Sequence, residues 1–451
     1  MKKDNRCDLI VIGGGLAGCE AAWQAANRNL KIKLFEMRPS LMTGAHETGN
    51  LAELVCSNSL GSNLIDRASG LLKEELRICG SLLMKAAEKS KIPAGNALAV
   101  DRNLFSQFVE SELASHPNIE IIREEVKIIP EQIPVILASG PLTSKDLSES
   151  IQSITGKENL FFYDAIAPVI TYDSINFKTA YKASRYGKGN ASEGDYINCP
   201  FTKEEYYQFA EALRTAERIA LHSFEGGIDQ GVNAGKESYF EGCLPVEVLA
   251  NRNPDALAFG PMRPVGLIDP RTNKRPYAVI QLRQDNLAGS LYNIVGFQTN
   301  LKQQEQNRVF HMIPGLENAV FERYGQMHRN TYIASPGLIN EFLQLTNDQR
   351  IFFAGQLSGV EGYVGNIASG LAAGINASAL IHQQPLVRFP DTTMIGALLH
   401  YISHAEKKHF QPMKANFGIL PPLDDPSRSK QDRGQQYSAR SLETIRKLML
   451  P

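Results

Sequence analysis

The sequence predicts an α/β protein in which a Rossmann-like domain is interrupted by an inserted α+β domain. Three observations predict this fold. A short apolar strand near the start of the chain runs into a glycine-rich turn and an alanine-rich helix. Two later apolar runs, at residues 134–138 and 351–354, also end in glycine turns. The stretch between these two runs has a different composition, with aromatic and polar residues in its predicted strands.

The first structural unit of the chain is a predicted strand, helix and strand. Residues 7–12 are mostly apolar and β-branched, which is typical of a buried parallel strand. An alanine-rich helix is predicted over residues 19–27, and a second strand over residues 31–36 ends on an acid. A helix of small residues, 367–381, follows the late glycine turn. These pieces fit one nucleotide-binding sheet assembled from both ends of the chain.

The domain organisation follows from this split. We expect residues 1–160 to form the first part of the nucleotide-binding domain and residues 161–324 to form the insertion. Residues 325–451 would complete the first domain and add a C-terminal extension, which is predicted to be rich in loops and prolines after residue 405. The predicted elements of the insertion are strands at 277–282 and 291–297 and an amphipathic helix at 203–218.

The glycine turn at the start has the spacing Gly13-x-Gly15-x-x-Gly18. The first glycine permits a tight turn, the second lets the backbone approach a pyrophosphate, and the third lets helix and strand pack closely. The N-terminus of the following helix favours phosphates. Glu36, at the end of the second strand, can accept hydrogen bonds from ribose hydroxyls. The residues predicted to bind a dinucleotide are Gly13, Gly14, Gly15, Leu16, Ala17, Gly18 and Glu36.

The choice between NAD and FAD depends on the late glycine turn. An NAD dehydrogenase does not need a second glycine-turned strand far along the chain. A flavoprotein does, because the ribityl chain and the isoalloxazine ring extend back across the domain. Gly355 and Gln356, followed by a helix, fit that contact. Gln356 stands where many flavoproteins have an aspartate. The pattern therefore favours FAD.

Charge and cysteine content limit the possible partners and the compartment. The 451 residues include 47 basic and 48 acidic side chains, so no global basic field indicates a nucleic acid. The six cysteines form no CxxC pair, and sparse cysteines in a long chain are typical of free thiols in a reducing compartment. No segment approaches the ~20 apolar residues of a membrane span. We predict a cytoplasmic protein.

Two cysteines are candidates for chemistry. Cys56 lies in a polar stretch soon after the nucleotide-binding unit, and Cys243 lies between a glycine and a turn-forming Leu-Pro pair. An exposed thiol with polar neighbours can ionise and act as a nucleophile, although most cysteines are small buried hydrophobes. Cys19 and Cys79 lie in helical patterns and are interpreted as structural, whereas Cys199 is left undecided.

A metal site is not expected. His400 and His404 are four residues apart, which places them on one face of a helix. An HExxH site would need a glutamate directly after His400, and Tyr401 stands there. Two histidines without further ligands do not make a metal site.

Three stretches of the chain are locally basic. Basic groups interleaved with aromatic rings suit a folded RNA, through phosphate contacts and stacked bases, but a solvated surface explains the same pattern. The tail from residue 405 carries nine basic and five acidic side chains. The other two stretches are Lys178, Lys182, Arg185 and Lys188 with Tyr181 and Tyr186, and Arg263, Arg271, Lys274, Arg275 and Arg283 with Asp269.

Longer motifs give a resemblance over essentially the whole chain. The stretches that carry it are residues 12–18, 52–60, 97–102, 240–245, 260–267, 281–286, 327–331, 355–363 and 410–413. With these stretches the sequence resembles the folate- and FAD-dependent tRNA (uracil-5-)-methyltransferases. It is also similar, at residues 313–318 and 354–356, to larger flavoproteins that modify the tRNA wobble uridine. Those relatives carry a long helical C-terminal domain, for which this chain stops too early.

The resemblance implies a reaction. The family takes a one-carbon unit from methylenetetrahydrofolate, and a hydride from FAD, itself reduced by NADPH or NADH, completes the methyl group. It implies that Cys243 is the nucleophile that adds to uracil, that Cys56 is a general base beside the flavin, and that Tyr363 lies with the cofactor-binding residues. The target base must leave the RNA stack to reach the flavin.

Four positions depart from the family pattern, and three alternatives stay open. Gly61, Gly365, Asn366 and Lys414 stand where the family usually has arginine, glutamate, serine and asparagine. The target could be a uridine of tRNA or of ribosomal RNA. Other hypotheses are a flavin oxidoreductase that acts on a small molecule and a flavin-containing RNA-binding protein without activity.

Overall fold

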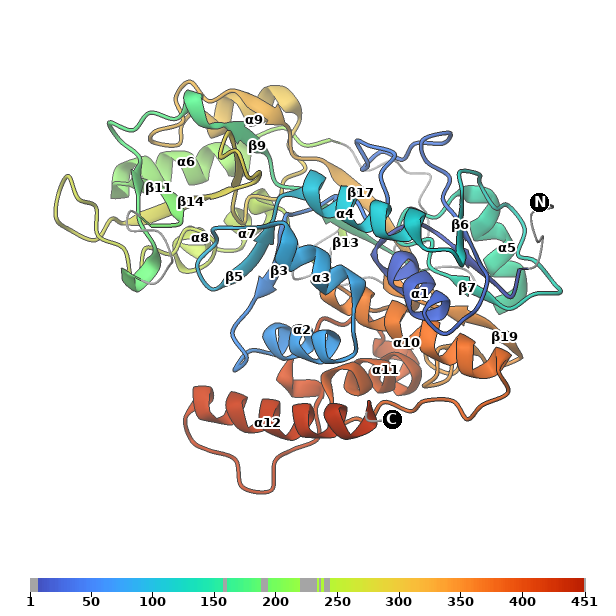
Figure 1. Cartoon of the computed structure of the whole chain (residues 1–451). Coiled ribbons are helices and arrows are strands. Elements are labelled where there is room, and N and C mark those ends of the chain that lie inside the picture. Colours follow the sequence, from blue (N-terminus) through green and yellow to red (C-terminus); the bar gives the residue numbers. More distant parts are fainter. Residues whose placement is uncertain are drawn as a thin grey trace.

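The computed structural model describes residues 7–156, 160–187, 194–219, 233–234, 237–238 and 244–449. Figure 1 shows two parts side by side. One contains the first and the late segments of the chain around a parallel sheet, and the other contains the middle of the chain around an antiparallel sheet. Each sheet has its own cluster of buried apolar side chains.

The parallel sheet has the strand order β18-β19-β7-β1-β2-β6. β1 (Leu9–Ile12) is buried along its whole length and pairs in parallel with β2 (Ile32–Phe35) and β7 (Val135–Leu137). β19 (Asp348–Phe353) pairs in parallel with β7, so a late strand completes a sheet begun near the N-terminus. This confirms the predicted α/β sheet. The outer strands are β6 (Ile119–Ile122) and the antiparallel β18 (Gln344–Leu345).

Two helices from opposite ends of the chain pack together beside this sheet. α1 (Leu16–Ala26) contacts α10 (Tyr363–Ile381) along its length. Gly370 and Gly374 permit this approach, because a Cβ at either position would collide with the backbone of α1. Among the described residues, α10 is the one helix long and apolar enough to cross a membrane, but 89% of its apolar window is buried. Its apolar composition is accounted for by core packing.

The antiparallel sheet has the strand order β10-β11-β14-β15-β9-β16. The central strand β14 (Ala278–Gln284) pairs with β11 (Tyr196–Phe201) and β15 (Leu291–Ile294). α6 (Lys203–Thr215) packs its apolar face into this core and begins at a capping box on Thr202. The two predicted strands and the predicted helix are thus confirmed. The other strands are β9 (Val169–Thr171), β10 (Tyr181–Lys182) and β16 (Phe321–Arg323).

The chain passes between the two sheets through paired strands. β8 (Leu160–Ala165) is antiparallel to β17 (Met327–Tyr332), with Ala165 opposite Met327. These strands lie close to the predicted boundaries after residues 160 and 324, which themselves stay a prediction. The remaining helices are α3 (Leu82–Lys89), α4 (Arg102–Ser115), α5 (Lys145–Thr155), α7 (Val246–Arg252), α8 (Ala256–Phe259) and α9 (Gln303–Phe310). The short strands are β3 (Ser59–Ser62), β4 (Lys91–Ile92), β5 (Ala97–Val100), β12 (Asn233–Ala234) and β13 (Glu237–Ser238).

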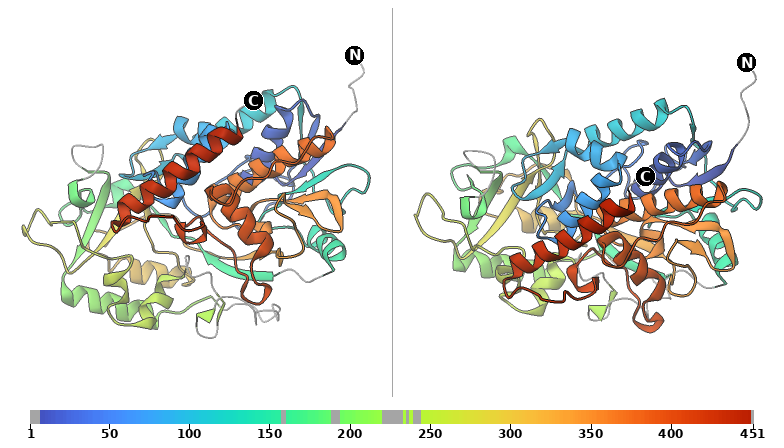
Figure 2. Two further views of the ribbon diagram at one scale, coloured as in Figure 1. Left: turned by 90° about the horizontal axis from the view of Figure 1, so that it is seen from below. Right: turned by 60° about the horizontal axis from the view of Figure 1, so that its bottom comes forward.

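The prediction of a loop-rich C-terminal extension is wrong for its last part. α12 (Lys430–Leu448) is a helix of 19 residues, which contacts α2 (Ala68–Ile78). Figure 2 shows it as a long red helix beside α11 (Met394–His404). Ser429 caps its N-terminus through a hydrogen bond from the backbone N–H of Asp432. After residue 405, Pro412, Pro421, Pro422 and Pro426 precede this cap and Pro451 follows the helix, so no proline interrupts it.

Glu75 of α2 joins both C-terminal helices to the nucleotide-binding part. Its carboxylate accepts hydrogen bonds from the backbone N–H groups of Met394 and Ile395, at 2.7 and 2.8 Å, and from the hydroxyl of Ser441 on α12. We predict that Glu75→Ala lowers the free energy of unfolding by about 2 to 4 kcal/mol, because three buried donors lose their acceptor. Denaturant titration of the wild-type protein and the variant measures this difference in the free energy of unfolding.

The neighbouring residue Glu74 provides a matched control for this prediction. Its side chain is 35% exposed and pairs with Arg77 on the same helix. Because exposed ion pairs contribute little, Glu74→Ala is expected to change the free energy of unfolding by about 0.5 kcal/mol or less. Equal destabilisation by the two substitutions would contradict the special role of Glu75.

Candidate functional site

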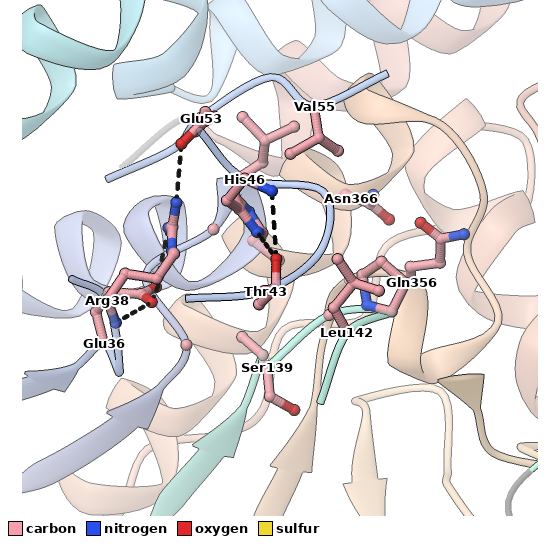
Figure 3. Close-up of a pocket in the computed structure, with 18 of the residues that line it drawn as sticks. Glu36, Arg38, Thr43, His46, Glu53, Val55, Ser139, Leu142, Gln356 and Asn366 are labelled. Atoms are coloured by element: carbon pink, nitrogen blue, oxygen red, sulfur yellow. Dashed lines mark hydrogen bonds and ion pairs between the residues drawn. The ribbon is translucent and has the colours of Figure 1, made fainter. Parts of the chain in front are cut away.

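A cavity lies where β1, β7 and β19 end, at the edge of the parallel sheet where α/β proteins bind ligands. Figure 3 shows Glu36 and Arg38 on one side of it and Gln356 and Asn366 on the other. Gly14 and Gly18 support the turn without lining the cavity. The predicted cofactor-binding residues that do line it are Gly13, Gly15, Leu16, Ala17, Glu36, Gly355, Gln356 and Tyr363.

The three motif glycines have different surroundings. Gly13 has a φ of +108°, and a Cβ there would collide with the carbonyl of Ala138. A Cβ on Gly18 would collide with the carbonyl of Gly13, so this glycine brings helix and strand together. A Cβ on Gly15 would meet no atom within 4 Å and would extend into open space. The cavity therefore has room for a phosphate directly against the backbone of Gly15, at the N-terminus of α1.

Glu36 is held in place by two neighbours. Its carboxylate accepts hydrogen bonds from the backbone N–H of Gly14 at 2.9 Å and from Nε of Arg38 at 2.9 Å. Burial by itself would raise the pKa of Glu36, but Arg38 outweighs that effect and keeps the pKa below its usual value. Arg38, which is 1% exposed and also pairs with Glu53, was not identified from the sequence. Its buried guanidinium fixes the ionised carboxylate at the cavity wall.

A second cavity adjoins the first and contains Cys56. The two cavities share Val55, Pro141, Leu142, Gln356, Tyr363 and Asn366. The second is also lined by Asn330, Glu361 and Lys414. Gln356 donates a hydrogen bond to Glu361 at 2.8 Å, and Lys414 lies 4.0 Å from the same carboxylate. A ligand that fills the first cavity therefore has its far end next to the cysteine.

Tyr363, at the start of α10, fixes the backbone of the cysteine loop. Its hydroxyl accepts hydrogen bonds from the backbone N–H groups of Cys56 and Ser57, at 2.8 and 3.0 Å. Burial, and then the charge of Cys56, raises the pKa of this hydroxyl far above its ordinary value. Tyr363 is therefore a neutral phenol at any working pH.

Three arginines surround the same loop. Arg283 of β14 donates to Ser57 Oγ at 2.8 Å and to Asn58 Oδ1 at 3.0 Å. Arg102 of α4 donates to the carbonyl of Leu54 at 2.8 Å. Arg323 of β16 extends toward the carbonyl of Val55 at 3.4 Å. Two of the three come from the antiparallel sheet. Two are paired with carboxylates, Arg102 with Asp285 at 3.1 Å and Arg323 with Glu47 at 3.5 Å. Positive charge favours the thiolate form of a cysteine.

Comparisons with known proteins identify the family. A family model described as Glucose inhibited division protein A matches residues 8–385. The chain is 54% identical to the methylenetetrahydrofolate–tRNA-(uracil-5-)-methyltransferase of Heliobacterium modesticaldum, over 98% of both chains. It is 53% identical to the enzyme of the same name from Anoxybacillus flavithermus, over 98% of this chain and 99% of that one. The chain belongs to this methyltransferase family.

A solved structure supports the fold. The structure of Aquifex aeolicus GidA matches with a TM-score of 0.68 and 16% identity, over 99% of this chain and 74% of that chain. At this identity the likeness concerns the fold alone. The family and the Rossmann-like fold class predicted from the sequence are confirmed.

The cysteines of this methyltransferase family member lie in very different environments. Cys243 lies outside the described residues, so its predicted role stays a prediction. Cys19 and Cys79 are buried, as predicted for structural residues, and burial raises the pKa of the Cys79 thiol to about 12. Cys199, left undecided, is fully buried in β11, and burial raises its pKa as well. Cys56 lines the second of the two adjoining cavities.

The basic stretches, which the sequence left open between an RNA contact and a solvated surface, are only partly exposed. Arg283 is wrong for that role, because it is 7% exposed and bonded to the Cys56 loop. The stretches at 178–188 and 263–283 do come together. Arg185 donates to the carbonyl of Val265 at 2.8 Å, and the backbone N–H of Tyr186 donates to the carbonyl of Gly266 at 2.9 Å. Tyr186 is 65% exposed there.

The positions that depart from the pattern of the methyltransferase family lie near the cavities. Asn366 lines both cavities and Lys414 lines the second one. Gly61 lies in β3, just after the cysteine loop, with a φ of +79°. A Cβ on Gly365 would lie 2.7 Å from the side chain of Val360, so a larger residue there needs that side chain to move.

His400 and His404 stack on each other, and no group of three possible metal ligands occurs among the described residues.

Proposed function

We propose that the protein methylates carbon 5 of the T-loop uridine of tRNA, which gives ribothymidine. Methylenetetrahydrofolate is the one-carbon donor, FAD is the hydride donor, and NADPH or NADH reduces the flavin. The observation that carries this proposal is the match, at 53–54% identity and along nearly the whole chain, to enzymes named for this reaction. Those names specify tRNA, which disfavours the ribosomal RNA alternative.

The cavity suits FAD as predicted from the glycine motif. The backbone at Gly15 and the N-terminus of α1 would hold the pyrophosphate, and Glu36 would accept hydrogen bonds from the adenosine ribose. Gly355, Gln356 and Tyr363 line the other end, toward the flavin ring. When bound and reduced by NADPH or NADH, the flavin supplies the hydride that converts a methylene group into a methyl group. The cavity next to Cys56 then takes the uracil and the folate.

The two candidate cysteines have complementary roles in this reaction. Uracil carbon 5 is a weak nucleophile. Addition of the Cys243 thiolate to carbon 6 makes carbon 5 enolate-like, so that it forms a bond to the methylene carbon of the folate. The bond between that carbon and the folate nitrogen then breaks, and tetrahydrofolate leaves with the electron pair. Cys56 takes the proton that carbon 5 loses, and Cys243 leaves carbon 6 at the end. Base extrusion from the folded tRNA brings the uridine to this cavity.

Cys56→Ala is predicted to lose methylation by about 10²- to 10⁴-fold, the usual contribution of a general base. It should still form a covalent complex with RNA that contains 5-fluorouridine, because the nucleophile is a different residue. The measurement is gel analysis of the complex together with nucleoside analysis of the tRNA. Full methylation by this variant would remove Cys56 from the mechanism.

Arg283 is predicted to keep Cys56 reactive. Arg283→Met removes a positive charge and the donors to Ser57 and Asn58, so the thiolate form of Cys56 should be less stabilised. The pH dependence of iodoacetamide labelling at Cys56, followed by peptide mass spectrometry, should move to higher pH. Arg283→Lys should keep most of the effect. Arg271→Met, at a partly exposed pair with Asp269, is the control and should leave the profile unchanged.

The donor test examines the function as a whole. Transfer of labelled carbon to tRNA should require methylenetetrahydrofolate and a reduced nicotinamide, and S-adenosylmethionine should not replace them. Activity with S-adenosylmethionine alone would overturn the proposal. Protein that binds FAD but no RNA would instead favour the flavin oxidoreductase that acts on a small molecule.

We also propose a cytoplasmic location, which fits the free thiols of the described cysteines.

A further inference from the structure

Asn366 occupies the junction of the two cavities. It lies in the first turns of α10 and lines both the proposed FAD cavity and the cavity of Cys56. Figure 3 shows it beside Gln356, across the cavity from Glu36. Its side-chain oxygen, Oδ1, is buried and has no hydrogen-bond partner among the described residues.

A buried acceptor without a donor is unfavourable, and native proteins rarely keep one without a reason. Gln356, the other amide at this end of the cavity, already donates to Glu361 at 2.8 Å. Asn366 therefore presents an acceptor that is satisfied when a ligand brings an N–H group. Its amide nitrogen can donate to a carbonyl at the same time, so the side chain is complementary to an N–H group next to a C=O group.

The direction of the cavity indicates which ligand atoms reach this position. Glu36 lies at the end expected for the adenosine ribose, and Gly15 lies at the pyrophosphate position. Asn366 lies at the opposite end, where the ring of the cofactor would be. The flavin ring carries an imide edge, an N–H group between two carbonyls. Uracil carries the same imide edge and approaches from the side of Cys56.

We propose that the side-chain amide of Asn366 binds the imide edge of a heterocycle at the junction of the two cavities, and that this heterocycle is the flavin ring of FAD. The inference rests on the proposed function, which supplies the cofactor. It adds a residue that determines specificity for the ring, at a position separate from the glycine motif that holds the phosphates. Uracil, which carries the same imide edge, is the alternative ligand of Asn366.

The experiment compares two ligands that differ by the ring. Calorimetry on the apoprotein measures binding of FAD and of ADP, which has the adenosine and the pyrophosphate but no flavin. Asn366→Leu keeps the branched shape of the side chain and removes both hydrogen bonds. Its affinity for FAD should fall about tenfold while its affinity for ADP stays unchanged. Asn366→Ser, which keeps one acceptor, should lose less. Retained ADP binding shows that each variant is folded.

Each remaining outcome is decisive. If FAD affinity is unchanged but covalent capture of 5-fluorouridine RNA at saturating FAD slows about tenfold, the imide is that of uracil. If neither changes, or if FAD and ADP lose affinity equally, Asn366 does not recognise an imide and the inference is overturned. A wild-type protein that binds ADP but not FAD overturns the proposed function itself, and this inference with it.

Discussion

Replacing Cys243 with alanine is expected to abolish methylation and, unlike the Cys56 replacement, to abolish covalent capture of 5-fluorouridine RNA. Removal of a nucleophile leaves no path around the covalent step, so the rate should fall by a factor on the order of 10⁴ or more. FAD and RNA binding should persist, because the residue lies far in sequence from the glycine motifs.

The environments of the other cysteines support this assignment. Cys19, Cys79 and Cys199 are buried, and burial raises the pKa of each thiol, so none can present a thiolate to RNA. Cys7 lies just before β1, where its Sγ donates to the carbonyl of Leu9 at 3.4 Å and burial again raises its pKa. Cys56 is proposed as the base. Cys243 therefore remains the proposed nucleophile for addition to carbon 6.

Mass spectrometry of the trapped complex identifies the attached peptide directly. The wild-type protein and Cys56→Ala should both carry the RNA on the peptide that contains Cys243. Cys199→Ala is the control, and its complex should form at the wild-type rate, although loss of a buried side chain lowers its stability. A complex formed by Cys243→Ala would point to Cys56 as the nucleophile, because Cys19, Cys79 and Cys199 are buried.

The sequence predicted the parts of the fold that depend on local patterns. The strands and turns around Gly13 and Gly355 are short apolar runs that end in glycines, and such a pattern needs no tertiary information. α12 was missed because its buried face is made largely of small residues and not of an apolar stripe. The residues on this face are Gly434, Ser438, Ser441, Leu442 and Ile445.

The candidate site also has a part that the sequence predicted and a part that only the fold reveals. Glu36 and the glycines follow from the spacing of one motif, but the partners that fix them do not. Arg283 reaches Asn58 across 225 positions of sequence, and only the fold brings them together. In the sequence, Arg283 belonged to a basic stretch, and charge pattern alone cannot distinguish an arginine that faces RNA from one that is buried against a loop. Asn366 likewise could be identified as a ligand-binding candidate only from the cavities that it lines.

Gly15→Val is expected to weaken FAD binding by about a hundredfold or more while the protein still folds. Gly15 has a φ of −78° and a ψ of −170°, an extended conformation that valine adopts readily. A Cβ there meets no protein atom within 4 Å. The added side chain therefore fills the space where the pyrophosphate approaches the backbone. The purified variant should be colourless, and it should bind neither FAD nor ADP in calorimetry.

Gly18→Val separates this effect from general disruption of the motif. A Cβ on Gly18 collides with the carbonyl of Gly13, so the variant must move the helix away from the strand and should lower the melting temperature. Gly15→Val should melt close to the wild-type apoprotein, because its side chain occupies ligand space only. Gly15→Ala, with a smaller side chain in the same space, should lose less affinity than valine. If Gly15→Val retained stoichiometric FAD, the pyrophosphate would have to bind elsewhere, and the orientation that places the flavin ring beside Asn366 and Cys56 would fail with it.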